Sequence, residues 1–75
     1  MTTEFLGYRV EWTGNPKAPC ILHGPRGATY GALSNVSNPE WFFLVDVGSR
    51  SPGTIRAAKG NGWLRIVGQE IVGAH

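Results

Sequence analysis

The stretch Trp41-Phe42-Phe43-Leu44-Val45-Asp46-Val47 is a continuous run of aromatic and aliphatic residues with one acid inside it. Turn-forming residues bound it on both sides, with Asn38-Pro39-Glu40 before it and Gly48-Ser49 after it. Because the run is too short for an independent helix, it predicts the central strand of the fold. Its apolar character indicates burial on both faces, or burial on one face with a loop or a partner over the other.

Strand signals also precede the central run. Every second residue is apolar from 6 to 12, which predicts one strand with a buried face made by Leu6, Tyr8, Val10 and Trp12. The segment 18–23 contains Pro19, which cannot donate to a ladder, so this segment predicts a short edge strand. The segment 28–33 mixes strand-forming and helix-forming residues, and Tyr30 with Gly31 favours a strand.

Two more strands and a last short one are predicted after the central run. Gly60-Asn61-Gly62 separates the segments 54–59 and 63–67. Because both positions of an Asn-Gly turn accept a positive φ, this pattern predicts a β-hairpin between the two segments. Gly68-Gln69 predicts a break or bulge, and residues 70–72 predict a short final strand.

One local pattern favours a helix instead. Asn38-Pro39-Glu40 has the form of a helix start, with Asn as N-cap and Pro at the first helical position, so at most one short helical turn is expected near 38–41. The other signals predict short strands joined by turns, to which 11 glycines and 5 prolines are suited. The expected fold is mainly all-β: a small antiparallel roll of five to six strands or a partly open SH3-like or OB-like barrel.

Length and composition limit the class of protein. A chain of 75 residues predicts a single domain over 1–75, with frayed ends at 1–4 and 73–75. Its one cysteine excludes an internal disulfide. The sequence has neither a signal-peptide pattern nor an apolar run of about 20 residues, so we expect a cytoplasmic protein, in its own cell or in a host cell, with no membrane partner.

Residues that could carry chemistry are few and poorly matched. Cys20 and His23 have the spacing of half a zinc site, but the sequence offers no convincing second pair of ligands. Three positions apart on a strand, their side chains point to opposite faces, which argues against a catalytic dyad. We expect Asp46, the acid of the central run, to bond a backbone N–H or an arginine. The sequence therefore predicts no catalytic site, no metal and no cofactor.

Cations gather in one part of the sequence. From residue 50 to residue 65 there are four cations and no acid, with Trp63 among them. Such a set suits a nucleic-acid backbone with an unstacked base, and it equally suits an acidic protein surface. Trp41 joins the set because 3 tryptophans, 2 tyrosines and 3 phenylalanines exceed what so small a core readily hides. The predicted binding residues are Arg50, Arg56, Lys59, Trp63, Arg65 and Trp41.

Three functional hypotheses follow from these patterns. The leading one is a non-enzymatic β-module that binds a larger protein, through an acidic surface or within a nucleoprotein complex. Small proteins of this kind include phage- and mobile-element-encoded inhibitors of a host defence or nucleic-acid machine, an analogy that depends on size alone. The first alternative is a nucleic-acid-binding SH3-like or OB-like domain that uses the basic hairpin at 50–65. The second alternative is a homo-oligomeric assembly protein that pairs across its exposed aromatic residues.

Overall fold

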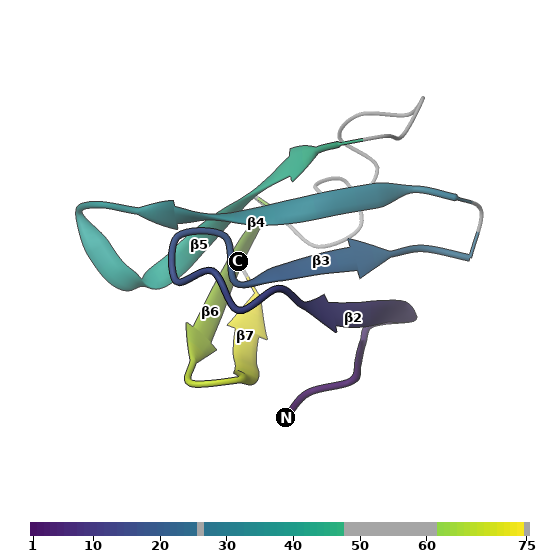
Figure 1. Cartoon of the computed structure of the whole chain (residues 1–75), viewed down its shortest axis with the longest axis horizontal. Helices are drawn as coiled ribbons and strands as arrows, with labels where there is room; N and C mark the ends of the chain where they lie inside the picture. Colours follow the sequence, from purple (N-terminus) through teal and green to yellow (C-terminus); the bar gives the residue numbers. More distant parts are fainter. Residues whose placement is uncertain (26, 48–61, 75) are drawn as a thin grey trace.

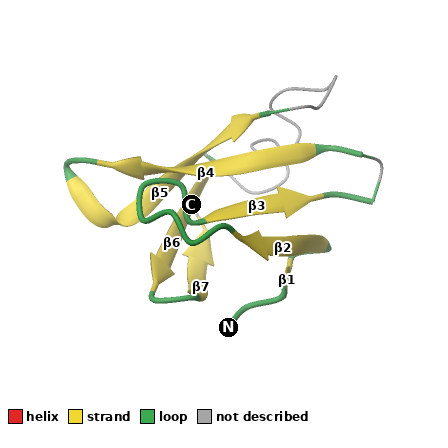
Figure 2. Ribbon diagram, viewed as in Figure 1, coloured by secondary structure: helices red, strands yellow, loops and turns green. Residues whose placement is uncertain are grey.

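In a computed structural model, residues 1–25, 27–47 and 62–74 are described, and they form one antiparallel sheet of seven strands. Each strand is hydrogen-bonded to its neighbours in the sequence. Figure 1 shows the course of the chain through the sheet. The strands are β1 (Glu4–Phe5), β2 (Tyr8–Trp12), β3 (Cys20–His23), β4 (Thr29–Asn35), β5 (Asn38–Asp46), β6 (Trp63–Val67) and β7 (Glu70–Ala74). The described residues contain no helix (Figure 2), so the all-β prediction is confirmed.

The sheet curls into a nearly closed barrel. In Figure 1 the β6–β7 hairpin runs across the direction of β2, β3 and β4, which places the two ends of the sheet on either side of one interior. The start of the chain bridges these ends, because the backbone N–H of Thr2 donates to the carbonyl of Gln69 at 2.8 Å. The N–H of Val10 on β2 donates to the carbonyl of Thr3 at 2.9 Å. The expected barrel is therefore observed, with its opening bridged by the N-terminal segment.

Alternate residues of the strands fill the interior. Because successive side chains of a strand point to opposite faces, one inward face per strand is enough to build a core. The rings of Tyr8 and Tyr30 meet edge to face there, with centroids 6.1 Å apart. The buried side chains are Tyr8, Val10, Cys20, Leu22, Tyr30, Ala32, Phe42, Leu44, Leu64, Ile66 and Ile71.

A tight turn splits the first predicted strand in two. Leu6 and Gly7 both have positive φ, 52° and 86°, and Phe5 pairs with Tyr8 across them. Two successive left-handed residues are the pattern of a type I′ hairpin turn. The prediction of one continuous strand from Leu6 to Trp12 is therefore wrong, and Leu6 is half exposed at the turn rather than buried.

The segment around Pro19 is not an edge strand, which corrects a second prediction. β3 pairs with β2 on one side and with β4 on the other. Pro19 lies one residue before the strand begins, so its missing N–H removes no ladder hydrogen bond. Its carbonyl accepts a hydrogen bond from the N–H of Thr13 at 2.9 Å, which joins the end of β2 to the start of β3.

The helical turn that the sequence allowed near 38–41 does not form, and these residues begin β5 instead. The side-chain oxygen of Asn38 accepts a hydrogen bond from the N–H of Glu40 at 3.2 Å, a contact that an N-cap also makes. Asn38 is at the same time the cross-strand partner of Asn35 in the β4–β5 hairpin. Pairing with β4 therefore decides the backbone conformation.

Only one half of the hairpin predicted between 54–59 and 63–67 is described, and it forms β6. β6 lies between β5 and β7, with Trp63 opposite Phe43 and Leu64 opposite both Phe42 and Ala74. Both edges of β6 are therefore paired with described strands. The segment 54–59 lies outside the described residues. β6 forms its hairpin with β7 through Gly68-Gln69, where Gly68 has a φ of 64°.

The described residues near the two ends of the chain lie in the sheet or against it. Thr2 and Thr3 bond to the sheet as described above, and Glu4 belongs to β1. Gly73 and Ala74 belong to β7, whereas His75 lies outside the described residues. Within the described ranges, no helix is long and apolar enough to cross a membrane.

Candidate binding site

The two faces of β5 have different environments. Phe42 and Leu44 point into the core, with exposed fractions of 7% and 8%. Their neighbours Trp41, Phe43 and Val45 point outward, and the Phe43 side chain is 37% exposed. The central strand is therefore buried on one face, and its other face carries aromatic side chains toward the surface.

Aromatic side chains from β5 and β6 meet on the outer face. Phe43 lies opposite Leu33 on β4 and opposite Trp63 on β6. The rings of Phe43 and Trp63 are 5.6 Å apart between centroids, at an interplanar angle of 68°. This edge-to-face arrangement is one that aromatic pairs prefer. We refer to Trp41, Phe43 and Trp63 as the aromatic face.

A shallow pocket of about 200 Å³ lies at one end of the aromatic face. Among the described residues its lining is formed by Trp41 and Trp63 together with Asn35 and Asn38 of the β4–β5 hairpin. The Oδ1 of Asn35 accepts a hydrogen bond from the N–H of Ser37 at 3.0 Å, and the Oδ1 of Asn38 accepts one from Glu40. Both amides are therefore held by the local backbone.

Among the described residues, the charge beside the aromatic face is balanced. Arg65 lies opposite Trp41, and its Nη2 is 2.9 Å from Oε1 of Glu40. Its Nε also donates to the same oxygen, at 3.1 Å. Both side chains are about half exposed, so the ion pair is a surface pair. Glu40 lies outside the 50–65 segment, so the sequence of that segment shows only cations and no partner for Arg65.

The structure brings together three of the six predicted binding residues. Trp41, Trp63 and Arg65 lie on neighbouring strands of one outer face. The other three, Arg50, Arg56 and Lys59, lie outside the described residues. Sequence reasoning missed Phe43 of the aromatic face, the pocket residues Asn35 and Asn38, and Glu40, which pairs with Arg65. The alternation of β5 carried a signal for Phe43, because an inward Phe42 requires an outward neighbour.

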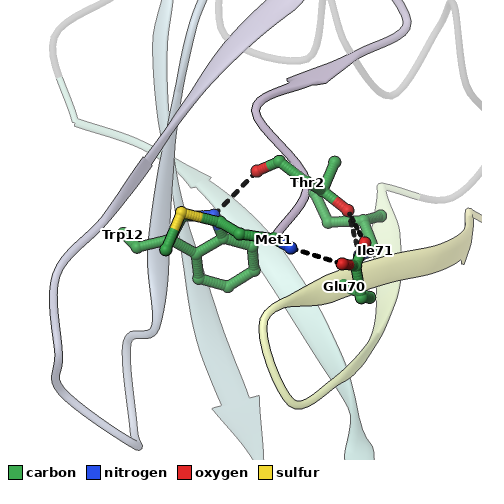
Figure 3. A network of polar contacts seen from close by, with 5 residues as sticks. All are labelled: Met1, Thr2, Trp12, Glu70 and Ile71. Carbon is green, nitrogen blue, oxygen red and sulfur yellow. Dashed lines mark hydrogen bonds and ion pairs between the residues drawn. The ribbon is translucent and has the colours of Figure 1, made fainter.

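The third indole has a structural role at the barrel opening (Figure 3). The Nε1 of Trp12 donates to the carbonyl of Thr2 at 2.7 Å. The hydroxyl of Thr2 donates to Glu70 at 2.7 Å and accepts from the N–H of Ile71 at 2.9 Å. Trp12 therefore helps to hold the N-terminal segment against β7 and is separate from the aromatic face.

Glu70 carries the charge of this closure. Its Oε1 lies 2.5 Å from the amino group of Met1, and its Oε2 accepts from Thr2. The hydrogen bond from the amino group, followed by that from Thr2, lowers the pKa of the Glu70 carboxyl. The carboxylate form is therefore favoured in the folded protein.

Cys20 and His23 lie on opposite faces of β3, as their spacing predicted. Cys20 is fully buried, and burial raises the pKa of its thiol to about 11. The Nε2 of His23 is 2.7 Å from Oε1 of Glu11 on β2. Across the described ranges, no three side chains of His, Cys, Asp or Glu lie together as metal ligands.

No protein-family model, curated protein or solved structure matches the chain. The role of the aromatic face therefore has to be inferred from its own residues and their neighbours.

Proposed function

We propose that this protein is a non-enzymatic β-module that binds a larger protein partner through the aromatic face. The observation that carries the proposal is the position of Phe43, which is 37% exposed on the outside of the sheet, opposite Trp63 and two residues after Trp41. Contiguous apolar surface on a small protein usually marks a contact surface. Tryptophan is also among the residues most enriched at the energetic centres of protein interfaces.

The balanced charge next to the aromatic face supports a protein partner over a nucleic acid. Binding to a phosphate backbone draws its free energy from cations that replace condensed counterions. Arg65 already has Glu40 as its partner, and the carboxylate offsets the charge that Arg65 would offer to a phosphate. Arg50, Arg56 and Lys59 would have to supply the remaining charge, and a steep salt dependence of binding would identify that alternative.

A module of this kind acts by occupying a surface of its partner. It would block whatever that surface normally binds, which is the mode of action expected of a small inhibitor, such as one encoded by a phage or mobile element. The identity of the partner is the first question for experiment. A second copy of the chain is the remaining alternative, and it would give a mass in light scattering that rises with concentration.

The proposal is tested by affinity capture from cell extract with two matched variants. Phe43→Ser removes an exposed apolar side chain from the aromatic face. Leu6→Asn removes one from the β1–β2 turn, which belongs to neither of the strands that carry the aromatic face. We expect Phe43→Ser to abolish retention of a partner that both the unchanged protein and Leu6→Asn retain. Equal retention by all three folded proteins would place the binding surface elsewhere.

A further inference from the structure

We infer that the first strand, β1, is exchanged between two copies of the chain when the protein is concentrated, so that each copy completes the barrel of the other. The exchanged segment is residues 2–5, and the hinge is the turn Leu6-Gly7. The exchange leaves β5 and β6 as they are, so it is independent of the proposed function. It follows from the contacts of the segment, the backbone at the hinge and the alternation of the sequence across the hinge.

The exchanged segment is held by contacts with residues on the far side of the hinge. The N–H of Thr2 donates to the carbonyl of Gln69 at 2.8 Å, and the hydroxyl of Thr2 accepts from the N–H of Ile71 at 2.9 Å. In Figure 3 the carbonyl of Thr2 accepts from Nε1 of Trp12. The rest of the segment pairs with β2. A second copy carries the same groups in the same positions, so these contacts form again after the exchange.

The hinge is strained in the closed barrel. Leu6 has a φ of 52°, and in the described part of the chain it is the only residue other than glycine with a positive φ. An L-residue in this region brings its Cβ too close to the following carbonyl oxygen, and leucine has no polar side-chain group to compensate. The Leu6 side chain is also half exposed, so burial contributes little to the turn. An extended hinge returns Leu6 to a negative φ, which is why short strained hinges favour exchange.

The sequence across the hinge fits an extended strand. Leu6 continues the alternation of Tyr8, Val10 and Trp12, the pattern that predicts one strand from 6 to 12. The closed barrel interrupts this pattern with a two-residue turn for which Asn-Gly, rather than Leu-Gly, is the favoured sequence. In the exchanged dimer the hinge is extended, so β1, the hinge and β2 form one continuous strand. A local preference that the closed barrel overrides is therefore satisfied in the dimer.

A second copy is the partner whose chemistry fits the place of β1. Phe5 lies opposite Tyr8 and packs against the core. Glu4 lies opposite Arg9, a cross-strand arrangement that favours opposite charges. Thr2 presents its hydroxyl to a backbone N–H at the start of β7. A strand from another protein would have to supply the same ring, acid and hydroxyl at the same spacing, whereas a copy of this chain supplies all three.

Hinge variants test the exchange through the dimer dissociation constant, measured by size-exclusion chromatography with light scattering up to millimolar protein. Leu6→Asn gives the turn its favoured sequence, and we expect it to weaken dimerisation about tenfold, because two turns form again for each dimer that dissociates. Gly7→Ala places a Cβ at a φ of 86°, where no atom beyond the neighbouring residues lies within 4 Å, so its cost comes from the backbone alone. We expect Gly7→Ala to strengthen dimerisation about tenfold.

Gly73→Ala is the matched control for Gly7→Ala. Its Cβ also has no atom within 4 Å beyond the neighbouring residues, and Gly73 does not have a positive φ. We expect Gly73→Ala to leave dimerisation unchanged. If the protein and Gly7→Ala both stay monomeric at millimolar concentration, the inference is overturned. Dissociation constants that Leu6→Asn and Gly7→Ala leave unchanged would also overturn it.

A disulfide between copies shows directly that β1 has moved. Glu4→Cys and Arg9→Cys are made in separate proteins, so the two cysteines lie opposite each other only where β1 of one copy pairs with β2 of the other. Cys20 is fully buried and does not compete. We expect the concentrated and oxidised mixture to form a covalent dimer that neither protein forms alone. A dimer that gives no such mixed disulfide would contradict the exchange.

Phe43→Ser separates this dimer from one formed across the aromatic face. The exchanged dimer should persist in Phe43→Ser, because residues 2–5 and the hinge lie outside that face. If Phe43→Ser abolishes the dimer, the copies meet through the aromatic face and the exchange is overturned. If the mixed disulfide fails to form while Phe43→Ser still abolishes partner capture, the exchange fails and the proposed function stands. If the disulfide forms while Phe43→Ser leaves capture unchanged, the exchange stands and the proposed function fails.

Discussion

Phe42 and Phe43 offer a direct test of the two faces of β5, because they are adjacent residues of the same type that point in opposite directions. We expect Phe42→Ala to destabilise the protein more than Phe43→Ala. Phe42 is 7% exposed in the core, and removal of a core phenylalanine costs about 3–5 kcal/mol. A domain of 75 residues has a total stability of roughly 4–11 kcal/mol, so Phe42→Ala removes a large part of it.

The cost of Phe43→Ala is smaller because water can fill the space that the ring leaves. The ring is 37% exposed, so only part of its transfer free energy of about 2–3 kcal/mol is lost. The edge-to-face contact with Trp63 adds about 0.5–1.5 kcal/mol. The expected total is about 2–3 kcal/mol, which is less than the cost of about 3–5 kcal/mol for Phe42→Ala.

Urea unfolding followed by circular dichroism measures both values on the same scale. The slope of the transition should be the same for the two variants, so that the midpoints report stability alone. Equal destabilisation by Phe42→Ala and Phe43→Ala would mean that the outer side of β5 is buried as deeply as its inner side. The proposal of an open aromatic face would then have to be abandoned.

Three further predictions concern the rest of the barrel. Leu6→Asn should raise stability by about 0.5–1 kcal/mol, because Asn before Gly7 suits the positive φ better than Leu, and a lower urea midpoint would contradict this. Glu70→Gln should lower the melting temperature at pH 7 but not at pH 3. The pKa of Glu70 is lower in the folded protein than its value of about 4.3 in the unfolded chain, so the carboxylate stabilises the fold at pH values above 4.3. This stabilisation is lost as the pH falls through the pKa of the folded protein. A difference between Glu70→Gln and the unchanged protein that is independent of pH would refute this origin. The thiol of Cys20 should react with an aromatic disulfide reagent at pH 8 only as fast as the protein unfolds, and complete labelling of the folded protein within minutes would contradict its burial.

The sequence predicted strands more reliably than it predicted where they end. Alternation placed Tyr8 and Val10 on one face of β2, and their burial confirms it. The same alternation was misleading at Leu6, because the two-residue turn changes which residues point inward. Even-numbered residues of β2 point inward, whereas the inward residue of β1 is odd-numbered. Phe5 is the residue of β1 that packs against the core, opposite Tyr8. Since leucine seldom adopts a positive φ, the local sequence gave little indication of the turn.

Long-range pairing explains what the local patterns missed. The Asn61-Gly62 pair is a strong local hairpin signal, but β6 pairs with β5, whose residues lie about twenty positions earlier in the chain. Local patterns carry no information on such pairing. The same register places Arg65 opposite Trp41 and brings Glu40 within reach of the guanidinium. The balanced charge of the candidate site could therefore not be predicted from the composition of the 50–65 segment.

Solvent paramagnetic relaxation, measured by NMR on the rings of Phe43 and Trp63, tests most directly whether the aromatic face is open and then covered by a partner. A soluble paramagnetic agent should relax these ring protons strongly in the isolated chain. The paramagnetic relaxation of these ring protons should be lost when the captured partner is added. The exposed methyl protons of Leu6 should still be relaxed by the agent in the complex. Rings that are already protected in the isolated chain, or that stay exposed in the complex, would contradict the proposed role of this face.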